Sequence, residues 1–325
     1  MKVLMTGGAG FIGSHLAEKY LERGDVVYII DDLSTGTLEN IKHLQDNESH
    51  KSRLFVTIDS ILNNKVMLEL VKTCDIILHM AAAVGVQYII ENPLSSIITN
   101  IKGTADVLGL CNRFKKKVLI ASTSEVYGKH THAPLVETDN IIYGPSTKFR
   151  WSYAAAKLMD EFTALAYHRT KKLSVIIIRL FNTIGSRQTG RYGMVIPRFV
   201  QQALRSEDIT VYGDGSQTRT FTYVGDVVDA ITKLMVCTDA EGEVVNIGGA
   251  EEIAIKDLAE RVKKLACSTS EIKLIPYDVA FTKDFEEMQR RVPSIEKIAK
   301  FIDWKPETGL DDAINKVIEF YRVYE

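Results

Sequence analysis

The sequence lacks several features that mark particular classes of protein. Its 325 residues include only four cysteines, and none of them has the CxxC spacing of a zinc or redox site. No apolar run is long enough to cross a bilayer, and no repeat, low-complexity tract or secretory leader is visible. The formal net charge of −2 excludes the basic excess of a typical nucleic-acid binder. We therefore expect a soluble, cytoplasmic protein with reduced thiols, no metal site, and neither nucleic acid nor a membrane as partner.

What the sequence does contain is a regular alternation of short apolar runs with helical patterns. Hydrophobic residues make up 46% and charged residues 25% of the chain, as in ordinary globular proteins. The apolar runs are rich in Val, Ile and Leu and lie at 2–5, 26–30, 54–58, 76–80, 118–122 and 174–180. Such runs are typical of parallel strands that helices cover on both faces. The pattern predicts an α/β protein with a doubly wound parallel sheet, the Rossmann fold.

The pattern loosens after Phe181, where a loop containing Gly and Arg begins. A helix from about Met194, a short strand "ITVYG" and further helices follow. We therefore predict a first domain at residues 1–181 and a smaller C-terminal α/β domain at residues 182–325. Residues 226–248 carry a helix and an apolar run that we expect to return to the first domain.

A glycine-rich turn, "TGGAGFIG", follows the first predicted strand and opens the first helix. Gly7, Gly10 and Gly13 stand at GxxGxxG spacing, which lets backbone N–H groups approach a pyrophosphate at the helix N-terminus. The glycines alone could mark nothing more than a tight turn. However, the second strand ends in Asp31 at the offset expected for a carboxylate that accepts the ribose hydroxyls of a dinucleotide. Together they predict a dinucleotide site.

Two further acidic positions refine the choice of cofactor. Asp32 stands beside Asp31 with no Arg after it, so a 2′-phosphate would be repelled and NAD is favoured over NADP. Asp59 and Ser60, after the third strand, could meet the adenine edge. An equally good alternative is that Asp59 simply caps the next helix.

Hydroxyl groups gather in "ASTSEVYG", directly behind the apolar run "VLI". About 30 residues later, "YAAAK" places Tyr153 and Lys157 one turn apart on one helix face. Removal of hydride from an alcohol carbon needs a base for the hydroxyl proton, and a phenol becomes one when nearby positive charge lowers its pKa. We expect Lys157 to acidify Tyr153 and to hold the nicotinamide ribose, with Thr123 at the same alcohol oxygen. Tyr167 and Lys171 repeat the spacing where the helix runs into solvent.

Together, "TGGAGFIG", "HMAAAVGV", "ASTSEVYG", "YAAAK", "RLFNTIG", "GDGSQTRTFTYVGD" and "RRVPSI" resemble the extended short-chain dehydrogenase/reductase family that acts on nucleotide-activated sugars. The resemblance covers essentially the whole chain. It implies that the first domain binds NAD and the C-terminal domain binds the nucleotide sugar, most closely a UDP-sugar. It also implies a catalytic triad of Thr123, Tyr153 and Lys157, and a homodimer formed by the helices 93–113 and 150–170.

The resemblance implies further site residues. Those expected to line the cofactor, beyond the positions already named, are Phe11, Ile12, Ala81, Ala82 and Asn100, the last as a support for Lys157. Those expected to contact the sugar nucleotide are Asn182, Arg187, Arg219 and Arg291, because guanidinium groups suit phosphate. Surface solvation is the alternative for the arginines.

The position of Glu125 bears on which reaction follows oxidation of C4. "TSE", with Ser124 where thymidine-sugar dehydratases resemble "TDE", is similar to the UDP-glucuronate decarboxylases. In those enzymes, a Glu beside the substrate carboxylate and an Arg in "RRVPSI", here Arg291, face the reacting sugar. The block "GRYGMVIPRF" is instead similar to the 4-epimerases. A UDP-sugar 4-epimerase and an NDP-sugar 4,6-dehydratase therefore stay open, as does a backbone-bonding role for Glu125. A non-catalytic NAD-binding protein is disfavoured because Tyr153, Lys157 and Thr123 are all present.

Overall fold

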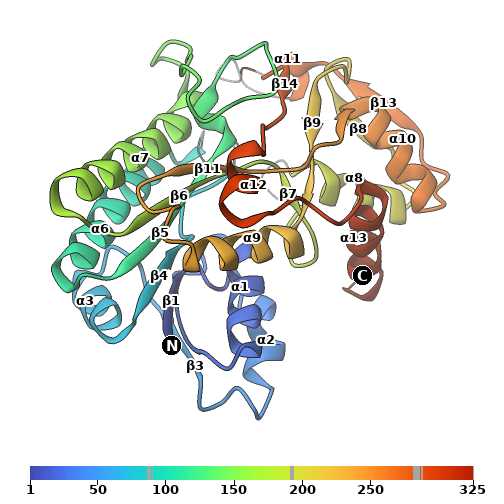
Figure 1. Ribbon diagram of the computed structural model, residues 1–325. Coiled ribbons are helices and arrows are strands. Elements are labelled where there is room, and N and C mark those ends of the chain that lie inside the picture. Colours follow the sequence, from blue (N-terminus) through green and yellow to red (C-terminus); the bar gives the residue numbers. More distant parts are fainter. Residues whose placement is uncertain (86–88, 90, 191–193, 281–285, 287, 325) are drawn as a thin grey trace.

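A seven-stranded, wholly parallel sheet forms the centre of the computed structural model, which describes residues 1–85, 89, 91–190, 194–280, 286 and 288–324 (Figure 1). In spatial order its strands are β3 (Leu54–Ile58), β2 (Val26–Asp31), β1 (Lys2–Thr6), β4 (Ile76–His79), β5 (Lys117–Thr123), β6 (Val175–Leu180) and β11 (Val244–Ile247). The order reverses between β1 and β4. In open parallel sheets, ligands bind beside such a reversal, at the carboxyl ends of the strands. The predicted doubly wound sheet is confirmed.

Successive side chains of each strand point to opposite faces of this sheet. On one face, Val3 and Met5 of β1 pack with α1 (Phe11–Glu22) and α9 (Val224–Val236). On the other face, Leu4 packs with α3 (Asn64–Thr73), α6 (Gly103–Phe114) and α7 (Ser152–Lys171). Both faces of the sheet are covered by helices and buried, which explains the nearly unbroken apolar runs in the sequence.

The last strand of the sheet comes from beyond residue 181. β11 pairs in parallel with β6, and α9, which precedes it, packs against α1. The chain therefore leaves the large sheet after β6, builds other structure, and returns at residues 224–247 before leaving again. α12 (Glu296–Ile302) adds a short helix on the same face.

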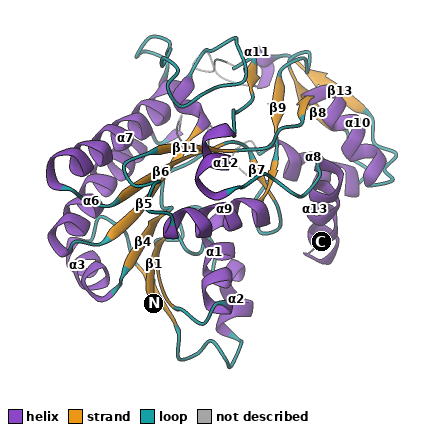
Figure 2. Cartoon of the chain, in the orientation of Figure 1, coloured by secondary structure: helices purple, strands orange, loops and turns teal. Residues whose placement is uncertain are grey.

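A second apolar core lies beyond the large sheet. It is built from α8 (Val195–Leu204), α10 (Ile255–Leu265) and α13 (Leu310–Tyr324), with β8 (Ile209–Tyr212) paired in parallel with β13 (Ile272–Ile275). Figure 2 shows these helices and small strands as a separate group. The remaining short elements are α2 (Glu39–Gln45), β7 (Thr183–Ile184), β9 (Thr218–Thr220), β10 (Thr222–Tyr223), β12 (Glu252–Ala254), α11 (Tyr277–Ala280) and β14 (Arg290–Arg291).

The helix predicted at 93–113 is interrupted by one wider turn. It consists of α5 (Pro93–Ile97), a π-helical turn η1 (Ile98–Lys102) and α6, and the buried Asn100 lies in the π turn. Isolated π turns inside helices often occur at functional sites. No periodicity in the sequence announces the extra residue, since one inserted residue only shifts the apolar stripe.

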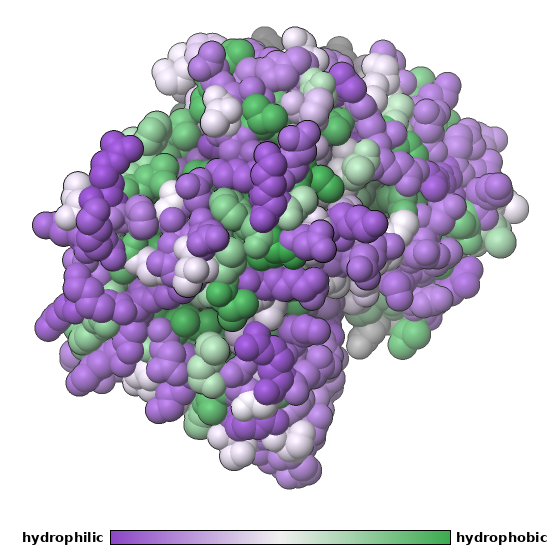
Figure 3. All heavy atoms as spheres, in the orientation of Figure 1, coloured by the Kyte–Doolittle hydropathy of each residue, from purple (hydrophilic) through white to green (hydrophobic). Residues whose placement is uncertain are grey.

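Large apolar side chains stay exposed along α5, η1 and α7. They are Leu94 (71% exposed), Ile98, Ile101, Met159 and Phe162 (59%). Figure 3 shows apolar surface among the charged side chains of the flank that α6 and α7 form. Among the described residues, no helix is both long and apolar enough to span a membrane.

Candidate active site

The glycine-rich turn between β1 and α1 is packed so closely that side chains would not fit. Gly7 has a φ of 70°, and a Cβ there would lie 2.8 Å from the backbone nitrogen of Ala81. A Cβ on Gly13 would lie 2.1 Å from the carbonyl oxygen of Gly7. Gly10 is the N-cap of α1, with Phe11 and Ile12 following in the first helical turn. The loop therefore exposes the N-terminus of α1 without Cβ atoms in the way, as a pyrophosphate needs.

Asp31 ends β2 beside this turn. Its carboxylate accepts hydrogen bonds from the backbone N–H groups of Ala9 and Leu33, both at 2.9 Å. Burial raises the pKa of Asp31 above its ordinary value, although these N–H groups oppose the shift. Asp31 thus stands at the glycine loop, as a carboxylate that binds ribose hydroxyls must.

The other two acidic positions act locally in the described structure. Asp32 accepts the N–H of Ser34, and Asp59 accepts the N–H of Ser60 and the side-chain amide of Asn63. Asn63, not Asp59, is the N-cap of α3. The alternative that Asp59 caps this helix is therefore wrong, because the helix begins five residues later and Asp59 instead accepts a hydrogen bond from its N-cap, Asn63.

Asn100 fastens the segment after β4. Its side chain accepts the N–H of Ala83 at 2.8 Å and donates to the carbonyl of the same residue at 3.2 Å. This segment follows Ala81 and Ala82, and Ala81 N–H is in turn bonded to Thr6 at 3.1 Å. Asn100 shows no described hydrogen bond to Lys157, so its support for the site runs through the backbone beside the glycine loop.

The hydroxyl-rich stretch forms the end of β5 and a short 3₁₀ turn, η2 (Ser124–Tyr127). Thr123 is the N-cap of that turn, and its hydroxyl accepts the N–H of Glu125 at 3.2 Å. Ser124 is buried, and the hydroxyl of Tyr127 donates to Asn246 of β11 at 2.8 Å. The hydroxyls therefore have different tasks, and only Thr123 lies at the strand end with its oxygen held toward the turn.

Lys157 is fully buried on α7 and is paired. Its ammonium donates to Asp160 Oδ2 at 2.9 Å, and the side chains of both residues are only 1% exposed. The sequence reading missed Asp160. Its signal was available, since a carboxylate three residues after Lys157 lies one helical turn away on the same face.

The protein's own groups do not acidify Tyr153. Burial raises the pKa of Tyr153 far above its ordinary value, and the charges of Glu125 and Asp160 raise it further, while Arg150 lowers it. In the chain by itself the pKa of Tyr153 is therefore raised, with burial as the largest cause. The expectation that Lys157, together with the cationic nicotinamide, acidifies Tyr153 stays a prediction for the enzyme with NAD bound.

Glu125 lies in a nest of arginines. Arg150 donates to one carboxylate oxygen at 2.5 Å, and Arg291 stands 3.6 Å from the other. Burial would raise the pKa of Glu125, but Arg150, Arg291 and Arg219 outweigh it and hold the pKa below its ordinary value. The carboxylate is thus ion-paired, and the described residues show no hydrogen bond from it to the backbone that would give it a capping or backbone-bonding role. Arg150, three residues before Tyr153, was not foreseen.

The arginines are placed by two short strands of the C-terminal unit. β14 pairs in parallel with β9, which sets Arg291 opposite Arg219. Arg291 donates to the side-chain oxygen of Asn182 at 2.8 Å, and Asn182 donates to the carbonyl of Thr220. Three of the four expected substrate residues are therefore brought together with Glu125.

The fourth, Arg187, is bound elsewhere. It donates to Glu18 of α1 at 2.5 Å and contacts His43 of α2 at 3.1 Å. Burial and Arg187 together lower the pKa of the neighbouring His15 to about 4. Arg187 therefore joins the helices next to the glycine loop and shows no described contact with Asn182, Arg219 or Arg291.

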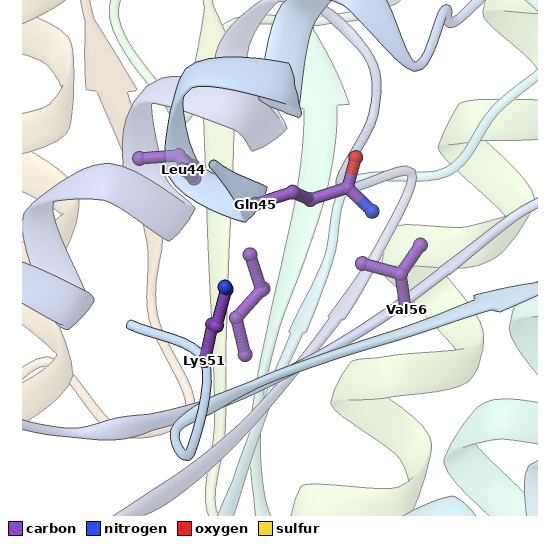
Figure 4. A pocket seen from close by; sticks show the side chains of 5 residues that line it. Leu44, Gln45, Lys51 and Val56 are labelled. Atoms are coloured by element: carbon purple, nitrogen blue, oxygen red, sulfur yellow. The ribbon is translucent and has the colours of Figure 1, made fainter. Parts of the chain in front are cut away.

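The residues present fit NAD. A turn without Cβ atoms faces a helix N-terminus, and Asp31 with Asp32 stands where ribose hydroxyls would lie. Among the described residues, no group of three or more His, Cys, Asp and Glu side chains is arranged to hold a metal ion. A pocket of about 260 Å³ lies apart from this site, at the β3 edge (Figure 4). It is lined by Leu44, Gln45, Lys51, Leu54 and Val56.

Comparisons with known proteins agree with this geometry. A UDP-N-acetyl-α-D-glucosaminuronate decarboxylase of Bacillus cytotoxicus is 39% identical over 325 residues, covering 100% of this chain and 98% of that protein. UDP-glucuronic acid decarboxylase 1 of Danio rerio is 35% identical, covering 98% of this chain and 72% of its own. The crystal structure of UDP-glucuronic acid 4-epimerase from Bacillus cereus, in complex with UDP-glucuronic acid and NAD, superposes with a TM-score of 0.89 at 28% identity over 100% of both chains.

The fold and the site thus define an extended short-chain dehydrogenase/reductase, an enzyme that modifies nucleotide sugars. Within it, the chain belongs to the family described as GDP-mannose 4,6 dehydratase, whose model matches residues 4–317. The block "GRYGMVIPRF", which is similar to the 4-epimerases, lies partly outside the described residues, since 191–193 are among those not described.

Proposed function

We propose that this enzyme is an NAD-dependent decarboxylase of a UDP-uronate, either UDP-glucuronate or its 2-acetamido analogue. The observation that carries the proposal is the placement of Glu125 between Arg150 and Arg291, in electrostatic contact with Tyr153. The guanidinium groups of Arg150, Arg291 and Arg219 all act on this carboxylate, and guanidinium groups also suit a second carboxylate, that of the uronate. The names of the two decarboxylase relatives support the same choice.

In this proposal, each side chain of the site carries out a different part of the reaction. Bound NAD accepts hydride from C4 of the sugar and later returns it. Tyr153 takes the C4 hydroxyl proton while Thr123 holds the same oxygen, and the resulting 4-ketone stands β to the carboxylate. Arg291 binds this carboxylate, and Glu125 beside it adds repulsion that the loss of CO2 relieves. A proton from solvent replaces CO2 at C5, and return of hydride to C4 with the proton of Tyr153 to O4 completes a UDP-pentose.

The raised pKa of Tyr153 has a place in this scheme. A phenol buried beside Glu125 and Asp160 keeps its proton, so it becomes a base only when positive charge arrives. Oxidised NAD brings that charge. Because the charge disappears on reduction, Tyr153 is again an acid when the 4-ketone has to be reprotonated.

Proton NMR of the purified enzyme with each UDP-uronate, together with measurement of CO2, tests the proposal. We expect stoichiometric CO2 and a new UDP-pentose, or its 2-acetamido analogue, from at least one of the two. Formation of the 4-epimer without CO2 would instead establish a UDP-uronate 4-epimerase, the candidate that the Bacillus cereus structure favours. Turnover of UDP-glucose or a GDP-sugar alone would remove the role assigned to Arg291. A thymidine-sugar 4,6-dehydratase is disfavoured, because Ser124 replaces the Asp of the "TDE" that those enzymes resemble, whereas a GDP-sugar 4,6-dehydratase is compatible with "TSE".

We also propose a homodimer in which α5, η1, α6 and α7 of two copies pack together. Leu94, Ile98, Ile101, Met159 and Phe162 are exposed along these helices, and apolar surface of this extent favours association. Light scattering should give twice the monomer mass of 36.4 kDa. Phe162→Glu should give the monomer, and a monomeric wild type would overturn the proposal. Four cysteines without disulfides are in keeping with a cytoplasmic enzyme.

A further inference from the structure

The buried pair of Lys157 and Asp160 has no net charge. The two side chains meet at 2.9 Å on one turn of α7, and each is 1% exposed. Whether the shared proton lies on the nitrogen or on the oxygen, the sum of the two charges is zero. This matters because a lone ammonium in such a site would act over several ångströms with little solvent screening.

Hydrogen bonds lock the pair to the cofactor loop. Asp160 accepts from Thr104 of α6, and the hydroxyl of Thr104 is 3.1 Å from His79 Nε2. The other ring nitrogen of His79 is 2.8 Å from the hydroxyl of Thr6, the last residue of β1. Burial and the charge of Lys157 lower the pKa of His79 to about 3, so the ring is neutral and adds no charge of its own. Asp160 is therefore held in place rather than free to leave Lys157.

We propose that Asp160 is a positioning residue that sets the relative affinity of the enzyme for oxidised and reduced NAD, by cancelling the charge of Lys157 beside the nicotinamide. The inference rests on the proposed function, which puts the nicotinamide next to Tyr153 and Lys157. Oxidised nicotinamide is a cation and reduced nicotinamide is neutral. An uncancelled ammonium would therefore favour NADH, whereas the neutral pair favours neither form.

The balanced charge of Lys157 and Asp160 also affects which sugar product the enzyme releases. A reaction that begins and ends with NAD must return its hydride before the 4-keto sugar escapes. Because Asp160 removes the electrostatic bias toward NADH, return of hydride is favoured. The enzyme should release the reduced UDP-pentose rather than the 4-keto-pentose, and a class of reaction that uses the pentose itself would then consume it.

The test is an exchange measurement that needs no turnover. The purified protein with its bound cofactor is equilibrated at about pH 6.5, near neutrality so that lysine stays charged, with mixtures of NAD and NADH. The fluorescence of bound NADH then gives the exchange constant. We expect Asp160→Asn to shift this constant toward NADH by about tenfold, the size expected for one uncancelled charge in a buried site. An exchange constant within about twofold of wild type in folded Asp160→Asn would overturn the proposal.

A double variant separates charge from structure. Lys157→Met with Asp160→Asn again leaves no net charge, so its exchange constant should return to within about twofold of wild type even though its turnover is lost. If Asp160 only supports packing, the double variant should depart from wild type at least as far as Asp160→Asn does, and this result would also overturn the proposal. The matched control is Asp229→Asn, which breaks the exposed ion pair with Lys233 on α9 and should leave the exchange constant unchanged. Melting temperatures of all variants report whether each is folded.

Discussion

Two groups of charged side chains lie near Tyr153, and they differ in the number and origin of their positive charges. Around Glu125, three arginines from separate parts of the chain surround one carboxylate. Beside Lys157, a single carboxylate three residues along the same helix balances a single ammonium. The first group gathers guanidinium groups from different elements of the chain, whereas the second is one ion pair within one helix.

The difference follows from where each group lies. Glu125 and Arg291 join η2, the turn that follows β5, to β14 of the C-terminal unit. Lys157 and Asp160 are sealed inside the core between α6 and α7, where an unbalanced charge would be costly. We infer that the arginines of the first group are suited to bind the carboxylate of a substrate, and that the balanced pair inside the core tunes its neighbours.

Removal of the Tyr153 hydroxyl, which lies between the two charged groups, should have the largest effect on turnover. Tyr153→Phe should lower turnover by about 1,000-fold, because no base remains for the C4 hydroxyl proton. The variant should fold normally and keep its NAD, as cofactor absorbance and melting temperature will show. Tyr167→Phe, at the other YxxxK spacing in α7, is the control and should keep wild-type turnover. Retained activity in Tyr153→Phe would remove this residue from the mechanism.

Neutralising the carboxylate of the first group should have the next largest effect. Glu125→Gln should lower CO2 release by about 100-fold, since a charge beside the reacting carboxylate is lost. Oxidation at C4 should partly persist, so absorbance of NADH should appear on mixing with substrate while CO2 does not. Unchanged CO2 release would limit Glu125 to pairing with the arginines.

The pH dependence of kcat/KM tests the ion pair between Arg150 and Glu125. Arg150→Met should raise the pKa of Glu125, because a strong ion pair is lost. If the carboxylate form is needed, the acid limb of the kcat/KM profile should move to higher pH by a similar amount. Arg150→Lys keeps the positive charge and should shift the acid limb of the profile less. Identical profiles for both variants and wild type would contradict this prediction.

The smallest effect expected is on stability in acid. The pKa of Glu125 is held below its ordinary value of 4.5 in the folded protein, so its stabilising contribution is complete above that pH. It should be lost as the pH falls through the lower pKa of the folded state. The free energy of unfolding of wild type should therefore fall more steeply below about pH 4.5 than that of Glu125→Gln. Denaturant titrations at several pH values check this, and parallel curves would count against it.

The glycine turn, Asp31 and the parallel sheet could be predicted from the sequence because each depends on neighbours along the chain. Gly7 needs its conformation whatever lies elsewhere, and Asp31 simply ends its strand at the glycine loop. Asp59 shows the limit of such reasoning. A short polar residue after a strand predicts a cap, yet Asn63 took that place because the helix starts later than the pattern suggests.

The sequence by itself determined the family, the positions of the sheet strands along the chain and the residue types of the triad. It could do so because apolar strand patterns, turn residues and helical spacing depend only on residues that are close in sequence. Only the tertiary structure decided which charges meet. Arg150 reaches Glu125 across 25 positions, Arg291 arrives from the far end of the chain, and Asp160 takes the charge of Lys157 that was expected to act on Tyr153. The pKa of Tyr153 is raised chiefly because the side chain is buried, and the charges of Glu125 and Asp160 add to this shift. A pKa depends on the sum of all charges and on burial, and both are set only when distant segments pack together.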